Sequence, residues 1–195
     1  MVSSEQQPGR GSVCPARYAG FLATSLRRLV HDPEKILAGL IEEGQVAVDL
    51  GCGPGFFTVP MARLVGERGR VIAVDLQQEM LDMMMRAAER RGLASRIRPH
   101  KCGNDAIGVA EKVDFVLAFY VVHEVPDVER FLGEVAAMLK SGGRFLLVEP
   151  KLHVTAGAFA KTLQIARSAN LALVAEPKVF FSTSAILQRV DGSES

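Results

Sequence analysis

The stretch Val46-Ala-Val-Asp-Leu-Gly-Cys-Gly-Pro-Gly55 decides the fold of this chain. Its first five residues are mostly apolar, which is typical of a strand buried on both faces of a parallel sheet. Glycines follow at positions 51, 53 and 55, and an apolar helical segment with Met61 and Leu64 comes next. Glycine adopts positive φ values and lets the backbone approach a ligand closely. A strand, a glycine turn and a helix in this order predict a ligand-binding turn in an α/β fold.

An acidic residue stands at the end of the next apolar run. Asp75 follows residues 71–74, twenty residues beyond the last glycine of the turn. A carboxylate there can accept both hydrogen bonds from a ribose diol. A dinucleotide fingerprint needs a third glycine where Phe56 stands, and Pro54 removes a backbone donor that a pyrophosphate would use. Asp49, just before the turn, suits a cationic ligand better than a phosphate. The pattern therefore predicts a nucleoside ligand without a pyrophosphate.

Strands and helices alternate through the middle of the chain. Apolar runs at 113–119 and 145–148 predict further buried strands, and a weaker strand is expected over 97–100. Apolar stripes at helical spacing predict helices that end at Gly92 and Gly142. This alternation implies right-handed crossovers and a doubly wound sheet.

The N-terminal region predicts two helices. The first begins at Pro15. The second has Asp32 as N-cap and Pro33 at its first position, and its apolar face continues to Gly44. The polar residues 1–14 are expected to form a flexible N-terminus.

The last third departs from simple alternation. A helix is predicted over 156–169, followed by a strand at 171–174. A break at Glu176-Pro177 precedes a further predicted strand at 179–181. Because this break is short enough for a hairpin, we expect the final strand to run antiparallel to its neighbour.

Composition limits the domain number and the partners. A chain of 195 residues with 48% hydrophobic content supports one core, so a single domain is expected over 15–190 with a tail at 191–195. The 23 basic and 22 acidic residues nearly cancel, so nothing favours a nucleic-acid partner. Cys14, Cys52 and Cys102 lack the spacing of a metal or disulfide framework. With no signal-peptide or membrane-span pattern, we expect a cytoplasmic protein without a metal or a membrane partner.

Several blocks together resemble the class I S-adenosylmethionine-dependent methyltransferases, over roughly residues 33 to 190. The turn and strand from Leu139 to Glu149 are similar to those of the branch that contains quinone-biosynthesis and other small-molecule methyltransferases. The resemblance implies a Rossmann-like α/β fold: a doubly wound, mostly parallel sheet of seven strands with an antiparallel last strand and helices on both faces. The blocks that match the family's motifs are 49–55, 71–75, 104–106, 113–119 and 139–149.

The resemblance also implies a set of site residues. The first motif holds the methionine part of the cofactor, the acid of the second binds the ribose, and the third lies near the adenine, where either Asn104 or Asp105 makes the contact. His123 and Tyr120 border the reaction centre and are the candidate catalytic residues, although a structural histidine is the alternative for His123. The implied cofactor-binding residues are Asp49, Gly51, Cys52, Gly53, Gly55, Asp75, Leu76, Asn104, Asp105, Ala106 and Phe119.

The family's reaction is an in-line transfer of a methyl group from S-adenosylmethionine, with S-adenosylhomocysteine as product. We expect a small-molecule acceptor, with the N-terminal helices as a partial lid. A protein or RNA methyltransferase is the alternative, for which arginines 10, 17, 27 and 28 are the local hint. A binding module without turnover is a second alternative, and a nicotinamide-dependent oxidoreductase is a third. The His123-Glu124-Val-Pro-Asp127 segment is not a zinc-protease motif, because its last residue is not histidine and Pro126 breaks the required helix.

Overall fold

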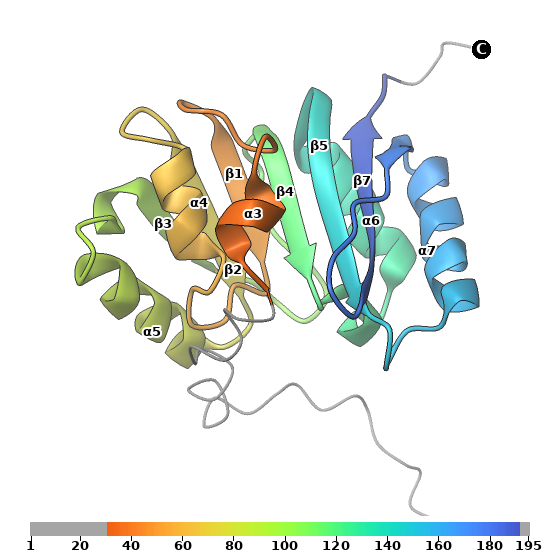
Figure 1. The fold of residues 1–195 in the computed structure, drawn as a ribbon, viewed down its shortest axis with the longest axis horizontal. Helices are drawn as coiled ribbons and strands as arrows, with labels where there is room; N and C mark the ends of the chain where they lie inside the picture. The colour runs from red at the N-terminus through yellow and green to blue at the C-terminus, as the bar shows by residue number, and fades with distance from the viewer. Residues whose placement is uncertain (1–30, 192–195) are drawn as a thin grey trace, which may run out of the picture.

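The computed structural model describes residues 31–191 and shows one seven-stranded sheet (Figure 1). The strand order is β3-β2-β1-β4-β5-β7-β6. β7 runs antiparallel to both of its neighbours, and the pairs between β1, β2, β3, β4 and β5 are parallel. This confirms the predicted fold class. The strands are β1 (Val46–Leu50), β2 (Arg70–Asp75), β3 (Ile97–Lys101), β4 (Val113–Phe119), β5 (Leu139–Pro150), β6 (Leu171–Ala175) and β7 (Ser182–Arg189).

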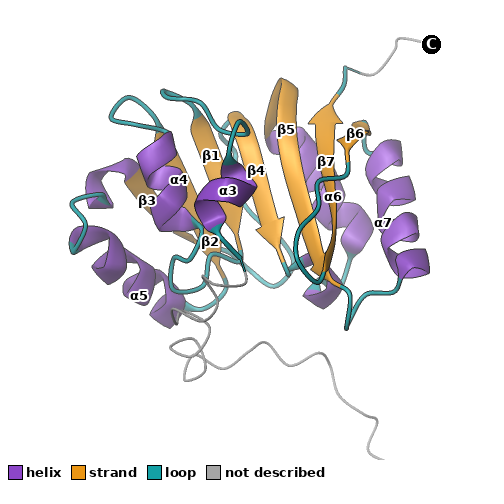
Figure 2. Cartoon of the chain, viewed as in Figure 1, coloured by secondary structure: helices purple, strands orange, loops and turns teal. Residues whose placement is uncertain are grey.

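Helices cover both faces of the sheet (Figure 2). One apolar cluster joins the sheet to α3, α4 and α5, and it includes Leu37, Met61 and Met84. A second cluster joins the opposite face to α6 and α7, and it includes Leu132 and Phe159. The helices are α3 (Pro33–Leu37), α4 (Thr58–Leu64), α5 (Gln78–Glu89), α6 (Val128–Met138) and α7 (Ala156–Ser168), with 3-10 turns η2 (Ala94–Arg96) and η3 (Val122–Glu124).

The central strands are buried on both faces, as their apolar runs predict. Ala47, Val48, Val116 and Leu117 have no exposed surface. Because β1 to β5 are parallel, their carboxyl ends meet at one edge of the sheet. The loops that carry the predicted site residues therefore converge at that edge.

The helix that begins after Asp32 is shorter than predicted. Asp32 does cap it, by accepting hydrogen bonds from the backbone N–H groups of residues 34 and 35. The helix ends at Leu37, however, and does not continue to Gly44. Gly39 has a φ of +71°, and the guanidinium of Arg144 donates hydrogen bonds to the carbonyl oxygens of residues 39 and 40. Because Arg144 of β5 satisfies these carbonyl oxygens, they need no helical partner, and a turn replaces the rest of the predicted helix.

The final strand was also placed wrongly. Residues 179–181 form a loop, and the strand is β7, Ser182–Arg189. β7 enters the sheet between β5 and β6 and pairs with β5 from Arg144 to Pro150. Its apolar residues are limited to Ala185, Ile186 and Leu187, with polar residues on either side, so its apolar run is shorter than those of the central parallel strands. Its antiparallel direction agrees with the prediction.

The α6 helix ends at Met138, whereas its apolar stripe predicted an end near Gly142; β5 already begins at Leu139, which pairs with Val113. The segment 1–14 and the helix predicted from Pro15, which is one of the two helices of the expected lid, lie outside the described residues. The domain boundaries at 15 and 190 stay predictions. No helix within 31–191 has the length and apolarity needed to cross a membrane.

Candidate functional site

A cavity of about 950 Å³ opens at the carboxyl edge of the parallel strands. This volume lies at the upper end of the range of small-molecule sites, about 300–1,000 Å³. The cavity brings together residues from the ends of β1, β2, β3, β4 and β5. Every predicted site residue except Gly55 lines it in the described part of the chain.

The glycine turn after β1 adopts left-handed backbone conformations. The φ angles are +65° at Gly51, +51° at Gly53 and +93° at Gly55. A Cβ atom at Gly51 would lie 2.6 Å from Cγ2 of Val121, so this glycine permits close packing. A Cβ at Gly53 would have no atom within 4 Å, which leaves open space beside the turn for a ligand. Gly55 instead faces α5, where a Cβ would meet Met84 at 2.8 Å.

Asp75 presents both carboxylate oxygens at the end of β2. Oδ2 accepts a hydrogen bond from the N–H of Gly53 at 2.9 Å, and Oδ1 accepts one from the N–H of Gln77 at 2.9 Å. Each oxygen retains a second lone pair that can accept from a ribose hydroxyl. Burial raises the pKa of the Asp75 carboxyl above its ordinary value, although these backbone N–H groups oppose the increase. Asp75 therefore also ties the glycine turn to β2.

Two further parts of the predicted cofactor site differ in burial. Asp49 is buried, and the hydroxyl of Thr58 donates a hydrogen bond to its Oδ2 at 2.5 Å. The loop from Asn104 to Ala106 is exposed at the cavity wall, and the Gly103 N–H donates to the Ala106 carbonyl oxygen. Both candidates for the adenine contact are thus accessible.

The Cys52 thiol is buried within the glycine turn. Its burial, together with the charges of Asp49 and Asp75, raises its pKa well above the ordinary value. A buried thiol with a raised pKa stays protonated and is a poor nucleophile. These properties favour packing as the role of this side chain.

Tyr120 follows β4 with a φ of +64°, an uncommon backbone conformation for a bulky residue. Its hydroxyl lies 2.6 Å from Oγ of Ser182 and 3.2 Å from Nε2 of His31. The Ser182 hydroxyl and His31 Nε2 also contact the Phe180 carbonyl oxygen, at 2.9 and 3.0 Å. The phenol thus joins three segments distant in sequence. Sequence reasoning missed His31 and Ser182, because no motif marks either of them.

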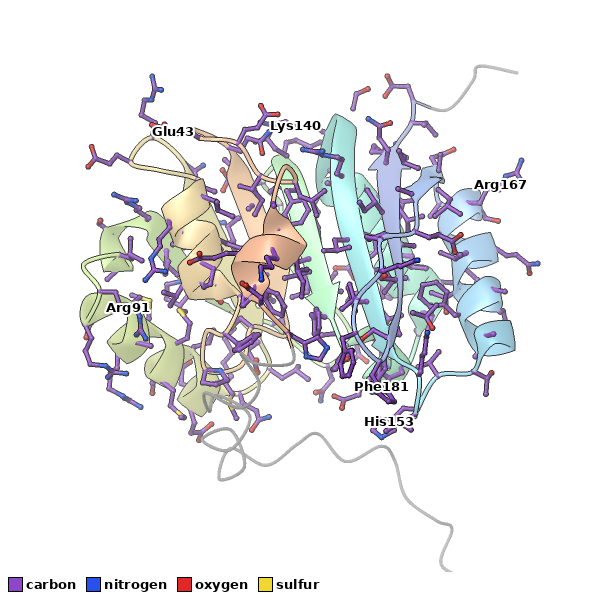
Figure 3. The ribbon with its side chains drawn as sticks, in the orientation of Figure 1. Glu43, Arg91, Lys140, His153, Arg167 and Phe181 are labelled. Carbon is purple, nitrogen blue, oxygen red and sulfur yellow. The ribbon has the colours of Figure 1, made fainter. Side chains whose placement is uncertain are left out.

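His123 forms a pair with Glu149, the last residue but one of β5. Nδ1 of His123 lies 2.5 Å from Oε2 of Glu149. Only 2% of Glu149 is exposed. The His153 ring centroid lies 5.7 Å from that of His123, and Figure 3 shows His153 with Phe181 at the lower end of β5. The sequence marks Glu149 as a candidate for the same crevice, because it follows the fifth apolar strand, with a solvated loop as the alternative, and its burial contradicts the solvated alternative.

The charge of the cavity wall distinguishes between ligands. Its described lining carries six carboxylates, whereas Arg130 is its single arginine or lysine. Such a wall favours the cationic sulfonium and ammonium groups of S-adenosylmethionine and disfavours the phosphates of a dinucleotide or ATP. With the open space at Gly53 and the carboxylate of Asp75, these residues fit this cofactor. The six carboxylates are Asp49, Asp75, Asp105, Glu124, Asp127 and Glu134.

Comparisons with known proteins agree with this geometry. Residues 41–180 match the family model described as a methyltransferase domain. A ubiquinone/menaquinone biosynthesis C-methyltransferase UbiE of Klebsiella pneumoniae is 31% identical over 110 residues, which cover 56% of this chain and 44% of that protein. A demethylmenaquinone methyltransferase of Lactobacillus johnsonii is 30% identical over 112 residues, covering 56% of this chain and 45% of the relative. The chain thus spans less than half the length of these curated relatives.

A solved structure shares the whole fold. A SAM dependent methyltransferase from Aquifex aeolicus superposes with a TM-score of 0.81 at 23% identity, and the match covers 91% of this chain and all of that one. The family match covers most of the sequence, and the sheet order and the nucleoside-type cavity agree with it. The chain therefore belongs to the class I S-adenosylmethionine-dependent methyltransferase family.

Proposed function

We propose that this chain catalyses methyl transfer from S-adenosylmethionine to a small-molecule acceptor. The observation that carries the proposal is that one cavity joins the glycine turn and Asp75 to the His123 side chain. A nucleoside site and a candidate proton acceptor at the same carboxyl edge provide what a methyl-transfer reaction on a weakly acidic acceptor requires.

The chain's own residues would bind the cofactor at the first two strand ends. Asp75 would accept the ribose hydroxyls, Asp49 and the turn around Gly53 would face the methionine part, and residues 104–106 would line the adenine. When bound, S-adenosylmethionine supplies a methyl group on positively charged sulfur, and the electron pair of the breaking carbon–sulfur bond stays on sulfur as the acceptor's electron pair forms the new bond. The protein has to orient the acceptor and exclude water.

His123 would remove the proton that the acceptor loses. Its ring lines the cavity, and Nδ1 is engaged by Glu149, which leaves Nε2 to accept a proton. Tyr120 would border the reacting groups with its ring, which lines the cavity. Its hydroxyl would not act as the base, because it already contacts Ser182 and His31. An acceptor that is already deprotonated would need no such base.

The cavity mouth supports a small acceptor with apolar surface. Leu152, Phe180 and Phe181 line the cavity and are 84%, 59% and 62% exposed. Exposed apolar side chains around a cavity favour binding of an apolar molecule, because contact removes their surface from water. The relatives named for quinone biosynthesis support the same class of acceptor.

The alternatives receive less support. The acidic lining opposes the phosphates of an RNA substrate, and the arginines that suggested one lie outside the described residues.

We also propose a cytoplasmic location, which the free thiols of Cys52 and Cys102 support.

Thermal unfolding with added ligands tests the cofactor assignment. S-adenosylmethionine and S-adenosylhomocysteine at 100 times Kd should stabilise the fold by about 2.7 kcal/mol. That corresponds to an increase in Tm of roughly 5–10 °C for a domain of this size. NAD and ATP should leave Tm unchanged, and equal stabilisation by NAD would refute the assignment.

A second experiment tests turnover. Incubation of a cell extract with methyl-labelled cofactor, with and without the protein, should give a labelled small molecule only when the protein is present. Label in protein or RNA would favour the alternative methyltransferases. Cofactor binding without any labelled product would favour a binding module.

A further inference from the structure

The Glu149 carboxylate is held at two points beneath the cavity. Its Oε1 accepts a hydrogen bond from the backbone N–H of Val122 at 3.0 Å, and its Oε2 contacts Nδ1 of His123 at 2.5 Å. Both partners belong to η3, the short turn that follows β4. A carboxylate that is 2% exposed is tolerated only where hydrogen bonds replace its hydration. Glu149 therefore connects the end of β5 to the turn that carries the candidate base.

The direction of the His123 contact decides what the imidazole can do. A carboxylate has only acceptor sites, so the hydrogen between the two groups must sit on Nδ1. A neutral imidazole carries one N–H, so Nε2 then keeps its lone pair. Burial raises the pKa of Glu149, whereas the contacts with His123 and the Val122 N–H oppose that increase. Two titratable side chains of the described residues lie near the pair: His153, whose ring centroid is 5.7 Å from that of His123, and Glu124, the next residue in η3.

We propose that Glu149 is a positioning residue: it holds the proton of neutral His123 on Nδ1 and leaves Nε2 as the proton acceptor for the methyl acceptor. This inference rests on the proposed function and adds a residue to it. In the methyl-transfer step the acceptor's proton moves to Nε2, and the resulting imidazolium is stabilised by the adjacent carboxylate. Glu149 itself does not contact the reacting atoms.

Nitrogen-15 NMR of the histidine side chains tests the proposal without a known acceptor. The 195-residue chain contains four histidines, and His123→Gln identifies the signals of His123 by their disappearance. At about pH 9, well above the unperturbed histidine pKa of about 6.5, a neutral ring shows one protonated and one unprotonated nitrogen. We expect Nδ1 to be protonated and Nε2 unprotonated. A proton on Nε2 instead, or a ring that is still doubly protonated, overturns the proposal.

The variant Glu149→Gln reverses the expected tautomer. The amide oxygen can keep the hydrogen bond from Val122, which places the amide NH₂ opposite Nδ1 of His123. Nδ1 must then act as the acceptor, and the proton moves to Nε2. Glu149→Asp retains a carboxylate and should restore part of the Nδ1–H form. Glu124→Gln is the matched control, because it neutralises the adjacent carboxylate and should leave the His123 spectrum unchanged. An unchanged tautomer in folded Glu149→Gln contradicts the proposal, and the wild-type spectrum decides the question if this variant does not fold.

Kinetics provide a second readout once an acceptor is found. Glu149→Gln should lower kcat by about 100- to 10,000-fold, the range for loss of a general base. It should match His123→Gln, and the double variant should lose no more than either alone. The Kd for S-adenosylmethionine should stay unchanged. Failure of S-adenosylmethionine to bind the wild type would refute the proposed function, whereas the wrong tautomer in a protein that binds it would refute this inference alone.

Discussion

Replacement of Asp75 by alanine is the sharpest test of the cofactor site. In the proposed cofactor site the wild-type carboxylate would perform two tasks, because it accepts hydrogen bonds from the backbone of Gly53 and Gln77 and would offer its remaining lone pairs to the ribose. Asp75→Ala removes both ribose contacts at once. It also leaves two backbone N–H groups to water at the cavity wall.

The expected loss follows from the number of hydrogen bonds. A hydrogen bond to a charged group contributes about 1.5–3 kcal/mol, so loss of two ribose contacts costs about 3 kcal/mol at the lower end of that range. Each 1.4 kcal/mol changes Kd by about tenfold, so the affinity for S-adenosylmethionine should fall by on the order of 100-fold or more. Asp75→Ala also removes the hydrogen bond that holds the turn at Gly53, which should lower the affinity further.

Isothermal titration of S-adenosylmethionine into both proteins measures the change, with the thermal midpoint as a check on folding. Asp82→Ala is the matched control, because Asp82 is an exposed carboxylate on α5 that hydrogen-bonds Gln78. Its Kd should stay within about twofold of the wild type. A folded Asp75→Ala protein with an unchanged Kd would show that the ribose binds elsewhere.

Five further outcomes are expected. Burial raises the Asp75 pKa above its ordinary value of 3.8, so the carboxylate takes up a proton at a higher pH than a free aspartate does. Titrations of the cofactor should therefore show its affinity falling as the pH drops towards the raised pKa of Asp75. The dependence of affinity on pH should be flatter for Asp75→Asn. Gly53→Ala should cost about 1–2 kcal/mol of stability in denaturant melts, from its left-handed backbone. Gly51→Ala should cost more, because its Cβ would lie 2.6 Å from a neighbouring side chain. His123→Ala should lower turnover about 100- to 10,000-fold across pH 5.5 to 9 and remove the acidic limb of the pH–rate curve, with cofactor Kd unchanged; turnover within about threefold of wild type would make this histidine structural. The Cys52 thiol should react with iodoacetamide at least about tenfold more slowly than in the unfolded chain, followed by mass spectrometry.

The parallel half of the sheet was predictable because its signals are local. A strand buried on both faces needs a continuous apolar run, so the bounds of β1 and β4 in the structure equal those of the runs at 46–50 and 113–119. The glycine turn and Asp75 were found for a similar reason, since positive φ and an acid at a strand end each require a particular residue type. Their meeting at one cavity follows from the parallel topology.

Long-range contacts explain the features that the sequence did not reveal. The helix after Asp32 stops early because Arg144, more than a hundred residues away, hydrogen-bonds the carbonyl oxygens of its predicted second half. The prediction of the last strand was wrong because pairing with β5 selects residues 182–189, and five of these eight residues are polar, so the apolar run is short.

The sequence by itself determined the fold class, the direction of the last strand and the glycine turn and strand-end acid that line the cavity, because each depends on residue types at short, regular spacing. Only the tertiary structure decided that Glu149 lies against His123 and that Tyr120 lies against Ser182 and His31. The partners in these contacts are 26, 62 and 89 residues apart. Their meeting depends on the order of β4, β5 and β7 in the sheet, and hydrogen-bond partners that distant leave no periodic pattern in the chain.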